Sequence, residues 1–368
     1  MTLTEPQSQP TTGEVRLNTL KIWQQNVYKS PICQHDIISS GKLAREGIDI
    51  VALQEPELYN FEEGNPEGTV TSKEWTTIFP STHATNSDKT RSLIPIRADI
   101  VTDDWSQIDI NLGDITAVLL RGSWGTLAIF NAYIDCNLDQ GIDDLATATR
   151  KYEDSSGSPR EKVHALWLGD FNRHHPHWDK TSDIRLFTSE ALIKADKLIK
   201  AVATAGLDLA LPPGMPTRKH NVTKKWTRLD QVFISEHTMD SLITCNALRG
   251  SPGIRTDHIP ILTTLNLNIK HAPTKIVKNY REVDWEEFRT ELRAKLSHLE
   301  QPAPIRDQLS LDTECRNLTT ALQETMSTQV PTTEICPKSK RWWTKELSMM
   351  RRNVNKLGRQ ASKCRGRP

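Results

Sequence analysis

Long apolar runs, paired cysteines and a secretory leader are all missing from this sequence. No stretch of about 18 apolar residues occurs, which excludes a transmembrane helix. The first residues, MTLTEPQSQPTTGEV, lack the basic and apolar segments of a secretion signal. The six cysteines contain no CxxC pair, which argues against a zinc site or a disulfide framework. We therefore expect an intracellular protein that is not secreted and has no membrane partner.

Charge is balanced over the whole chain but not along it. The 368 residues include 47 Lys or Arg and 46 Asp or Glu, and the mean hydropathy of −0.53 is typical of a globular protein. Residues 337–368 hold 11 of the bases and only one acid, Glu346, so the rest of the chain is net acidic. An acidic body excludes a protein that coats nucleic acid with its whole surface, but it permits binding in a local groove.

Short β-rich segments alternate with helical ones over the first two thirds of the chain. Two helices are expected at residues 35–47 and 189–206, and the second ends on Gly206, a residue typical of helix C-termini. Strands are expected at residues 19–26, 48–55, 115–122, 125–134, 163–172, 229–235 and 259–267. This order predicts an α/β protein of mixed sheets flanked by helices.

After Lys270 the composition changes to helical stretches separated by Pro-containing breaks. These stretches are residues 283–301, 311–327 and 342–363. We therefore expect three parts: a disordered leader (1–16), a folded domain (17–268) and a helical, basic, linker-like extension (269–368).

Polar side chains stand where the apolar strands end. These residues are Asn26, Glu55, Tyr133, Asp170, Asn172, Asp230, Asp257 and His258. One carboxylate at a strand end is usually a solvated loop residue, but several around one sheet edge indicate a site. Carboxylate and amide oxygens are ligands that Mg²⁺ prefers, and a His held by an Asp can donate a proton or stabilise an anion.

Five ordered motifs resemble those of the endonuclease/exonuclease/phosphatase superfamily. They are Asn26, Gln54-Glu55, Gly169-Asp170-Phe171-Asn172, Arg228-Leu229-Asp230 and Thr256-Asp257-His258-Ile259-Pro260-Ile261. The resemblance spans about residues 18–268, and the five motifs together are far more specific than any one alone. It implies a four-layered α/β sandwich of two packed sheets and Mg²⁺-dependent cleavage of phosphoester bonds, with Mn²⁺ as a substitute.

The resemblance also implies roles for individual residues. Glu55 would bind the metal with Asn26 and Asp257 nearby. Asp170 would orient or deprotonate the attacking water, and Asn172 would hold that water or a phosphate oxygen. His258, paired with Asp230, would stabilise charge on the scissile phosphate, and Tyr133 would support the phosphate or the leaving oxygen.

Two segments are similar to LINE-type non-LTR retrotransposons in particular. The run His174-His175-Pro176-His177-Trp178 after GDFN resembles their endonuclease domains, and Arg341-Trp342-Trp343 resembles the segment leading to their reverse transcriptase. No polymerase motif of the Tyr- or Phe-x-Asp-Asp type occurs, so the chain looks like a truncated element or a fragment of one. Such an enzyme would nick double-stranded DNA and leave a 3′-hydroxyl that primes reverse transcription, which implies a nuclear location and needs no obligate protein partner.

Four cations between Pro216 and Lys225 are the expected DNA contacts. They are Arg218, Lys219, Lys224 and Lys225, on a loop that in LINE-like endonucleases enters a DNA groove. The alternative is a solvated hairpin without a DNA role. For the basic tail, a linker that lacks its partner domain is as good an interpretation as a nucleic-acid-binding segment. Two other functions also stay open: a phosphomonoesterase of the same superfamily, and a catalytically inactive remnant that still binds nucleic acid.

Overall fold

The computed structural model describes residues 19–60, 66–155, 163–250, 253–271, 275–297 and 304–335, with 346–347, 349–350 and 353. The expected leader and almost all of the basic tail lie outside these residues. The chain forms two compact units, residues 1–271 together with 348–368 and residues 272–347, and we describe each unit by itself.

The first unit contains two six-stranded sheets, each with both parallel and antiparallel pairs. In the first sheet the order is β13-β14-β1-β2-β4-β3. Its strands are β1 (Leu20–Asn26), β2 (Ile50–Gln54), β3 (Trp75–Ile78), β4 (Ser92–Arg97), β13 (Leu242–Ala247) and β14 (Ile261–Leu265). Only β1 and β2 pair in parallel within it.

The second sheet has the order β5-β6-β7-β8-β12-β9. Its strands are β5 (Trp105–Ile108), β6 (Ile115–Gly122), β7 (Gly125–Tyr133), β8 (Val163–Asp170), β9 (Leu207–Leu209) and β12 (Asp230–Ser235). Here β7 and β8 form the parallel pair, and β12 returns antiparallel to β8. A separate two-stranded hairpin, β10 (Arg218–Lys219) and β11 (Trp226–Thr227), precedes β12.

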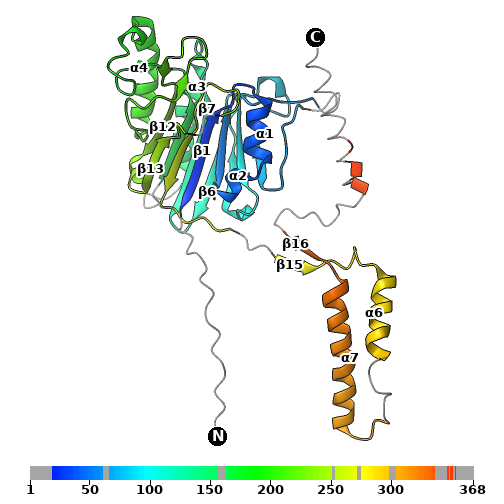
Figure 1. The fold of residues 1–368 in the computed structure, drawn as a ribbon. Helices are drawn as coiled ribbons and strands as arrows, with labels where there is room; N and C mark the ends of the chain where they lie inside the picture. Colours follow the sequence, from blue (N-terminus) through cyan, green and yellow to red (C-terminus); the bar gives the residue numbers. More distant parts are fainter. Residues whose placement is uncertain are drawn as a thin grey trace, which may run out of the picture. The chain divides into compact units, whose positions relative to one another are not determined.

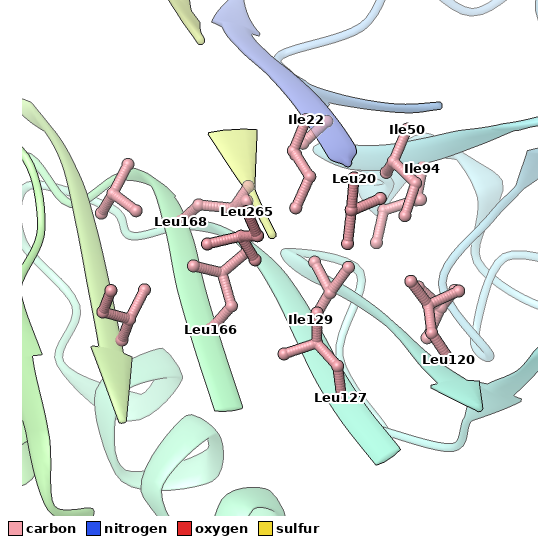
Figure 2. Packing of buried hydrophobic residues seen from close by; sticks show 14 of the residues in the cluster. Leu20, Ile22, Ile50, Ile94, Leu120, Leu127, Ile129, Leu166, Leu168 and Leu265 are labelled. Atoms are coloured by element: carbon pink, nitrogen blue, oxygen red, sulfur yellow. The ribbon is translucent and has the colours of Figure 1, made fainter. Parts of the chain in front are cut away.

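The central strands are buried on both faces because alternate side chains enter different cores. Ile22 of β1 and Ile129 of β7 point between the two sheets, where residues of both sheets form one apolar cluster (Figure 2). Trp23 and Phe130, one position further along the same strands, point to the outer faces. Neighbouring positions therefore hold the two sheets to each other and to their helices.

Helices cover the two outer faces, which completes four layers (Figure 1). Ile37 of α1 (Pro31–Ser39) and Leu43 of α2 (Lys42–Arg45) join the outer core of the first sheet. Helices α3 (Gln140–Ser155) and α4 (Ser189–Thr204) cover the second sheet, and α5 (Glu236–Met239) follows β12. Short 3₁₀ turns are η1 (Ser87–Lys89), η2 (Thr102–Asp104) and η3 (Ile184–Leu186). The expected four-layered α/β sandwich is confirmed.

The expected single helix at residues 35–47 is wrong in detail. It is two helices that are separated at Gly41, where the backbone has a φ of 69° that helices do not adopt. Helix α1 also begins earlier, with Ser30 as its N-cap and Pro31 in its first turn. Helix α4 ends close to the expected position, and Gly206 follows it in the left-handed conformation.

The second unit joins a two-stranded sheet to a helical hairpin. Its elements are β15 (Lys275–Lys278), α6 (Trp285–Ser297), α7 (Gln308–Gln329) and β16 (Thr332–Ile335), with β15 antiparallel to β16. The sequence predicted α6 and α7 but neither strand. No helix in the described part of either unit is long and apolar enough to cross a bilayer.

Candidate active site

Strand register brings the polar strand ends to one end of the two sheets. In the first sheet Asn26 pairs with Gln54, so Glu55 follows directly beside it. In the second sheet Asp170 pairs with Tyr133 on one side and with Asp230 on the other. Because β1 contacts β8 across the sandwich, the two groups face one another. The sequence predicted these residues at strand ends, and the register places them together.

A buried imidazole is the centre of the site. The Nδ1 of His258 lies 2.8 Å from Asp230 Oδ2, which also accepts a hydrogen bond from the Thr217 hydroxyl at 2.6 Å. The opposite nitrogen, Nε2, lies 3.8 Å from Asp170 Oδ2 and 3.7 Å from Asp257 Oδ1. The carboxylate of Asp230 therefore fixes the ring orientation and directs Nε2 toward two further carboxylates.

The protonation of this cluster follows from burial and from charge. Burial alone would lower the pKa of His258, but the neighbouring carboxylates, Asp230 foremost, outweigh it and raise the pKa to about 9. Burial and the charge of Asp230 raise the pKa of Asp170 well above its usual range. The carboxylates therefore favour the protonated imidazole, a state suited to stabilising negative charge on a phosphate.

Asn26 links the two sheets at the site. Its amide nitrogen lies 2.9 Å from Asp170 Oδ2 and 3.4 Å from Glu55 Oε1, while its Oδ1 accepts a hydrogen bond from the Tyr28 backbone N–H. The amide thus presents its nitrogen to the carboxylates. In this arrangement Asn26 spaces Glu55 from Asp170, and its oxygen is occupied elsewhere.

Asp257 lies on the other side of the imidazole. Its Oδ2 accepts a hydrogen bond from Arg218 Nε at 2.8 Å, whereas its buried Oδ1 has no hydrogen-bond donor. A buried carboxylate oxygen without a donor is costly, and a bound cation would satisfy it.

The donor set fits a divalent cation that prefers hard oxygen ligands. Among the described residues, the ligand atoms of Asp170, Asp230 and His258 lie within 4.8 Å of one another. Asp170 and Asp230 each already accept two hydrogen bonds, so Asp257, whose Oδ1 has no donor, and the nearby Glu55 are the better oxygen donors.

Tyr133 is held in place by an arginine that sequence reasoning missed. The Arg91 guanidinium lies 4.7 Å from the centre of the Tyr133 ring, and it donates two hydrogen bonds to Asp114 and one to Asp135. Burial and the adjacent Glu55 carboxylate raise the pKa of the Tyr133 hydroxyl. The hydroxyl is therefore a hydrogen-bond donor throughout the physiological range. No motif marks Arg91, because its partners are distant in sequence.

Two of the expected site residues have left-handed backbone. Glu55 has a φ of 47° and Asn172 a φ of 49°, each just after a strand. The Asn172 backbone N–H donates to Asp170 Oδ1 at 3.0 Å, and its side-chain amide donates to the carbonyl of Ile134. Asn172 thus fixes the Asp170 carboxylate and the turn after β7 at the same time.

The four cations expected to contact DNA do not share one environment. Arg218 points to Asp257 within the site, whereas the Lys219 ammonium lies 5.5 Å from the centre of the Trp226 ring. Lys224 and Lys225 are exposed in the loop between β10 and β11. Of the four cations, Arg218 therefore lies at the site carboxylates, and Lys219, Lys224 and Lys225 lie elsewhere on the hairpin.

Buried amides join the sheets next to the site, and of these only Gln54 belongs to a motif found in the sequence. The Gln54 amide donates to Asn131 Oδ1, and the Asn131 amide donates to the carbonyls of Leu53 and Leu93. Gln24 donates across the sandwich to the Gly169 carbonyl at 3.0 Å. Each bond would be lost if one sheet moved by one residue, so together they fix the relative position of Asn26 and Asp170.

The comparisons with known proteins agree with this geometry. Residues 127–262 match the family model described as "Endonuclease-reverse transcriptase", a range that contains Tyr133, Asp170, Asp230 and His258. This match supports the endonuclease/exonuclease/phosphatase superfamily that the motifs indicated. No curated protein matches the chain.

The chain is also similar to solved structures. The chain is similar to the endonuclease domain of TRAS1, a telomere-specific non-LTR retrotransposon, with 15% identity and a TM-score of 0.51 over 67% of this chain and 99% of that one. It is also similar to the AP endonuclease LMAP from Leishmania major, with 13% identity and a TM-score of 0.49 over 70% of this chain and 89% of that one. For an AP endonuclease from Archaeoglobus fulgidus these values are 15% and 0.47, over 67% and 100%.

The family match supports a hydrolase of the nuclease or phosphodiesterase kind. The superfamily is generally dependent on divalent metals, and the carboxylate cluster around His258 is a possible metal site.

Proposed function

We propose that the first unit is a Mg²⁺-dependent DNA endonuclease that nicks one strand and leaves a 3′-hydroxyl, with Mn²⁺ as a substitute metal. The observation that carries this proposal is the buried His258–Asp230 pair directed at Asp170, beside the Asn26–Glu55 contact. In this arrangement Asp170 is a general base, protonated His258 is a fixed positive charge, and the carboxylates offer oxygen ligands for a metal. Cleavage of a phosphodiester by water needs these three parts.

Each residue then has a separate task. Asp170 receives the proton of the attacking water, and its raised pKa suits a general base near neutral pH. His258 donates a hydrogen bond from Nε2 to a phosphate oxygen, and Asp230 keeps the ring charged and oriented. Tyr133 supports the phosphate or the leaving oxygen, and Asn172 positions Asp170. A cation held by Glu55 and Asp257 would supply positive charge at the phosphate and the leaving oxygen.

The substrate and the biological role are part of the same proposal. Double-stranded DNA would lie across the β10–β11 hairpin, where Lys219, Lys224 and Lys225 contact phosphates. A nick with a 3′-hydroxyl would prime target-primed reverse transcription in an intact retrotransposon. This role implies a nuclear location, and it requires no obligate protein partner.

A plasmid assay tests the chemistry. We expect the purified chain to convert supercoiled plasmid to open circles with Mg²⁺ or Mn²⁺ and not with EDTA. A DNA polymerase should extend the nicks without prior phosphatase treatment, because their ends carry a 3′-hydroxyl. Glu55→Ala should lower both the rate and the apparent affinity for the metal. Asp208→Ala is a matched control, since Asp208 is an exposed acid on β9.

The alternatives give different results in the same assay. A phosphomonoesterase would release phosphate from a 3′-phosphorylated oligonucleotide and leave the supercoiled plasmid intact. A catalytically inactive remnant would retard the plasmid in a gel without converting it in any metal. Nicking that continues at full rate in EDTA would contradict the proposal.

A further inference from the structure

Arg218 lies beside the imidazole of the site because of the way two segments pair. It stands opposite His258 in an antiparallel bridge, in which the flanking residues exchange two backbone hydrogen bonds. Residues at such a non-hydrogen-bonded position have Cα atoms about 4.5 Å apart and side chains on the same face. The register therefore places the Arg218 side chain next to the imidazole.

The backbone around Arg218 is fixed to the site on both sides. The hydroxyl of the preceding residue, Thr217, donates to Asp230 Oδ2 at 2.6 Å, and the N–H of the following residue, Lys219, donates to the Asp257 carbonyl at 2.8 Å. Thr217 is buried, whereas residues 221–226 further along the hairpin are all exposed. Arg218 thus belongs to the framework of the site and not to the exposed loop.

The guanidinium of Arg218 has hydrogen-bond donors that the fold leaves unused. Its Nε donates to Asp257 Oδ2 at 2.8 Å, but in the part of the chain that the structure describes neither Nη group has an acceptor. Arg228, which precedes Asp230 by two residues, differs because its Nε and both Nη groups donate to Gln231 Oε1 or to backbone carbonyls. The Arg218 side chain is 27% exposed, which leaves room for a ligand to reach it.

Charge holds Arg218 at the carboxylates. Burial lowers the pKa of its guanidinium, but the carboxylates of Asp257, Asp170 and Asp230 outweigh burial and raise it. Arg218 therefore adds a second positive charge to that of protonated His258. Because it occupies only Oδ2 of Asp257, the other oxygen of that acid stays open for the metal that the proposed function needs.

The proposed reaction develops negative charge that these unused donors suit. A water oxygen bonds to phosphorus, the water proton passes to Asp170, and the bond from phosphorus to the 3′ oxygen breaks with its electron pair on that oxygen. Charge is spread over the non-bridging oxygens in the transition state, where donors that are already in position stabilise it best. Arginine suits this task because its planar fork can donate two parallel hydrogen bonds to a phosphate.

We propose that Arg218 is a catalytic residue, whose Nη groups donate to the non-bridging oxygens of the scissile phosphate while its Nε stays on Asp257. The inference rests on the proposed function, and it assigns Arg218 to the chemical step rather than to the groove contacts of the lysines on the same hairpin. None of the five motifs in the sequence contains Arg218, so the resemblance to the superfamily does not supply this role.

Single-turnover cleavage of a duplex with one mapped cut site tests the role. Arg218→Gln should lower the rate roughly 10²-fold at saturating Mg²⁺, because the loss of one donor to a developing oxyanion has an effect of that size. The Kd for the duplex should change little, since the contact strengthens mainly in the transition state. Arg218→Lys keeps the charge but not the fork, so it should recover only part of the rate.

Arg121→Gln is the matched control for the loss of a cation. Arg121 is exposed on β6 and pairs with Thr126, at the other end of β7 from Tyr133. Its variant should cut and melt like the wild type. The Arg218 variants should also melt like the wild type, and the charged Arg218→Lys keeps the comparison valid if the neutral variant does not fold.

Sulfur substitution at the scissile phosphate tests the contact itself. Two phosphorothioate diastereomers each replace one non-bridging oxygen by sulfur, which is a weaker hydrogen-bond acceptor. We expect the wild type to cut at least one of them more slowly than the normal phosphate, and this sulfur effect should shrink in Arg218→Gln and in Arg218→Lys. A residue that acted only by orienting Asp257 would leave both sulfur effects as they are in the wild type.

The outcomes separate this inference from the function on which it rests. If the wild type nicks DNA and Arg218→Gln keeps its single-turnover rate, or loses only DNA affinity, Arg218 is not catalytic. Recovery of the full rate at high Mg²⁺, or unchanged sulfur effects, would make it a support for Asp257 and overturn the inference. If the wild type cuts no DNA with any divalent metal, the proposed function itself fails.

Discussion

His271 provides a stability test that does not involve catalysis. Its Nδ1 lies 3.0 Å from Asp99 Oδ1 and its Nε2 lies 3.4 Å from Asp49 Oδ1, so one imidazole contacts an acid just before β2 and an acid just after β4. Hydrogen bonds that the imidazole donates to Asp49 and Asp99 raise the pKa of His271 to about 9. The perturbation is His271→Gln, which removes the charge and keeps a polar side chain of similar length.

The magnitude follows from linkage. A histidine whose pKa rises from about 6.5 in the unfolded chain to about 9 would stabilise a fully buried site by about 3 kcal/mol. The side chains of His271 and Asp99 are 23% and 30% exposed, so water screens the pair and about 1 kcal/mol is the better expectation. Because the folded pKa is the higher one, the stabilisation is complete below pH 6.5 and is lost as the pH rises through 9.

Urea unfolding of the full chain at pH 6 and pH 10 measures the effect. We expect His271→Gln to unfold with about 1 kcal/mol less free energy than the wild type at pH 6 and with little difference at pH 10. His237→Gln is the control, since His237 is exposed on α5. An equal loss at both pH values, or a larger loss at pH 10, would refute the electrostatic explanation.

Three further predictions concern the site and the domain boundary. Asp170→Ala and His258→Ala should each lower the single-turnover cleavage rate on the order of 10²-fold, and the double variant should lose less than the product because both act on one step; a normal rate with weaker DNA binding would contradict these roles. A chain ending at Asn268 should have a lower melting temperature than one ending at His271, because the Lys270 carbonyl accepts a hydrogen bond from the Val101 N–H. Equal melting temperatures would place the domain boundary before Lys270. Arg91→Lys should lower kcat more than it raises KM, because the ring of the site tyrosine loses its support, and unchanged kinetics would leave Arg91 a purely structural residue.

The sequence predicted the layered fold because the central strands are regular. It missed β4, whose Pro95 argues against a strand, although the structure pairs Pro95 with Thr77 on the edge strand. It also missed α3, in which the polar Thr149 interrupts the apolar spacing. Thr149 is nevertheless buried, and its hydroxyl accepts a hydrogen bond from Trp167. Both errors arise where tertiary contacts override a local pattern.

The sequence could predict only those site residues that lie at the ends of recognisable strands or in the motifs next to them. The motif residues Asp170 and Asp230 come together because β8 and β12 pair in register, and His258, which precedes β14 of the other sheet, reaches Asp230 through its side chain. Thr217 and Arg91 carry no local signal, since both act through contacts with residues that are distant in the sequence. The sequence also grouped Arg218 with the DNA-contacting lysines, and its ion pair with Asp257 could not be inferred from loop composition.

The left-handed backbone at Glu55 and Asn172 has a consequence for evolution and engineering. A non-glycine residue in that region costs on the order of 1 kcal/mol, more for Glu than for Asn, which tolerates it better. Glycine at either position would relieve the cost and remove the functional side chain at the same time. Stability and activity therefore oppose each other at these two positions. A chain selected for thermal stability alone would lose Glu55 before most of its surface residues, and it would become more robust as it became inert.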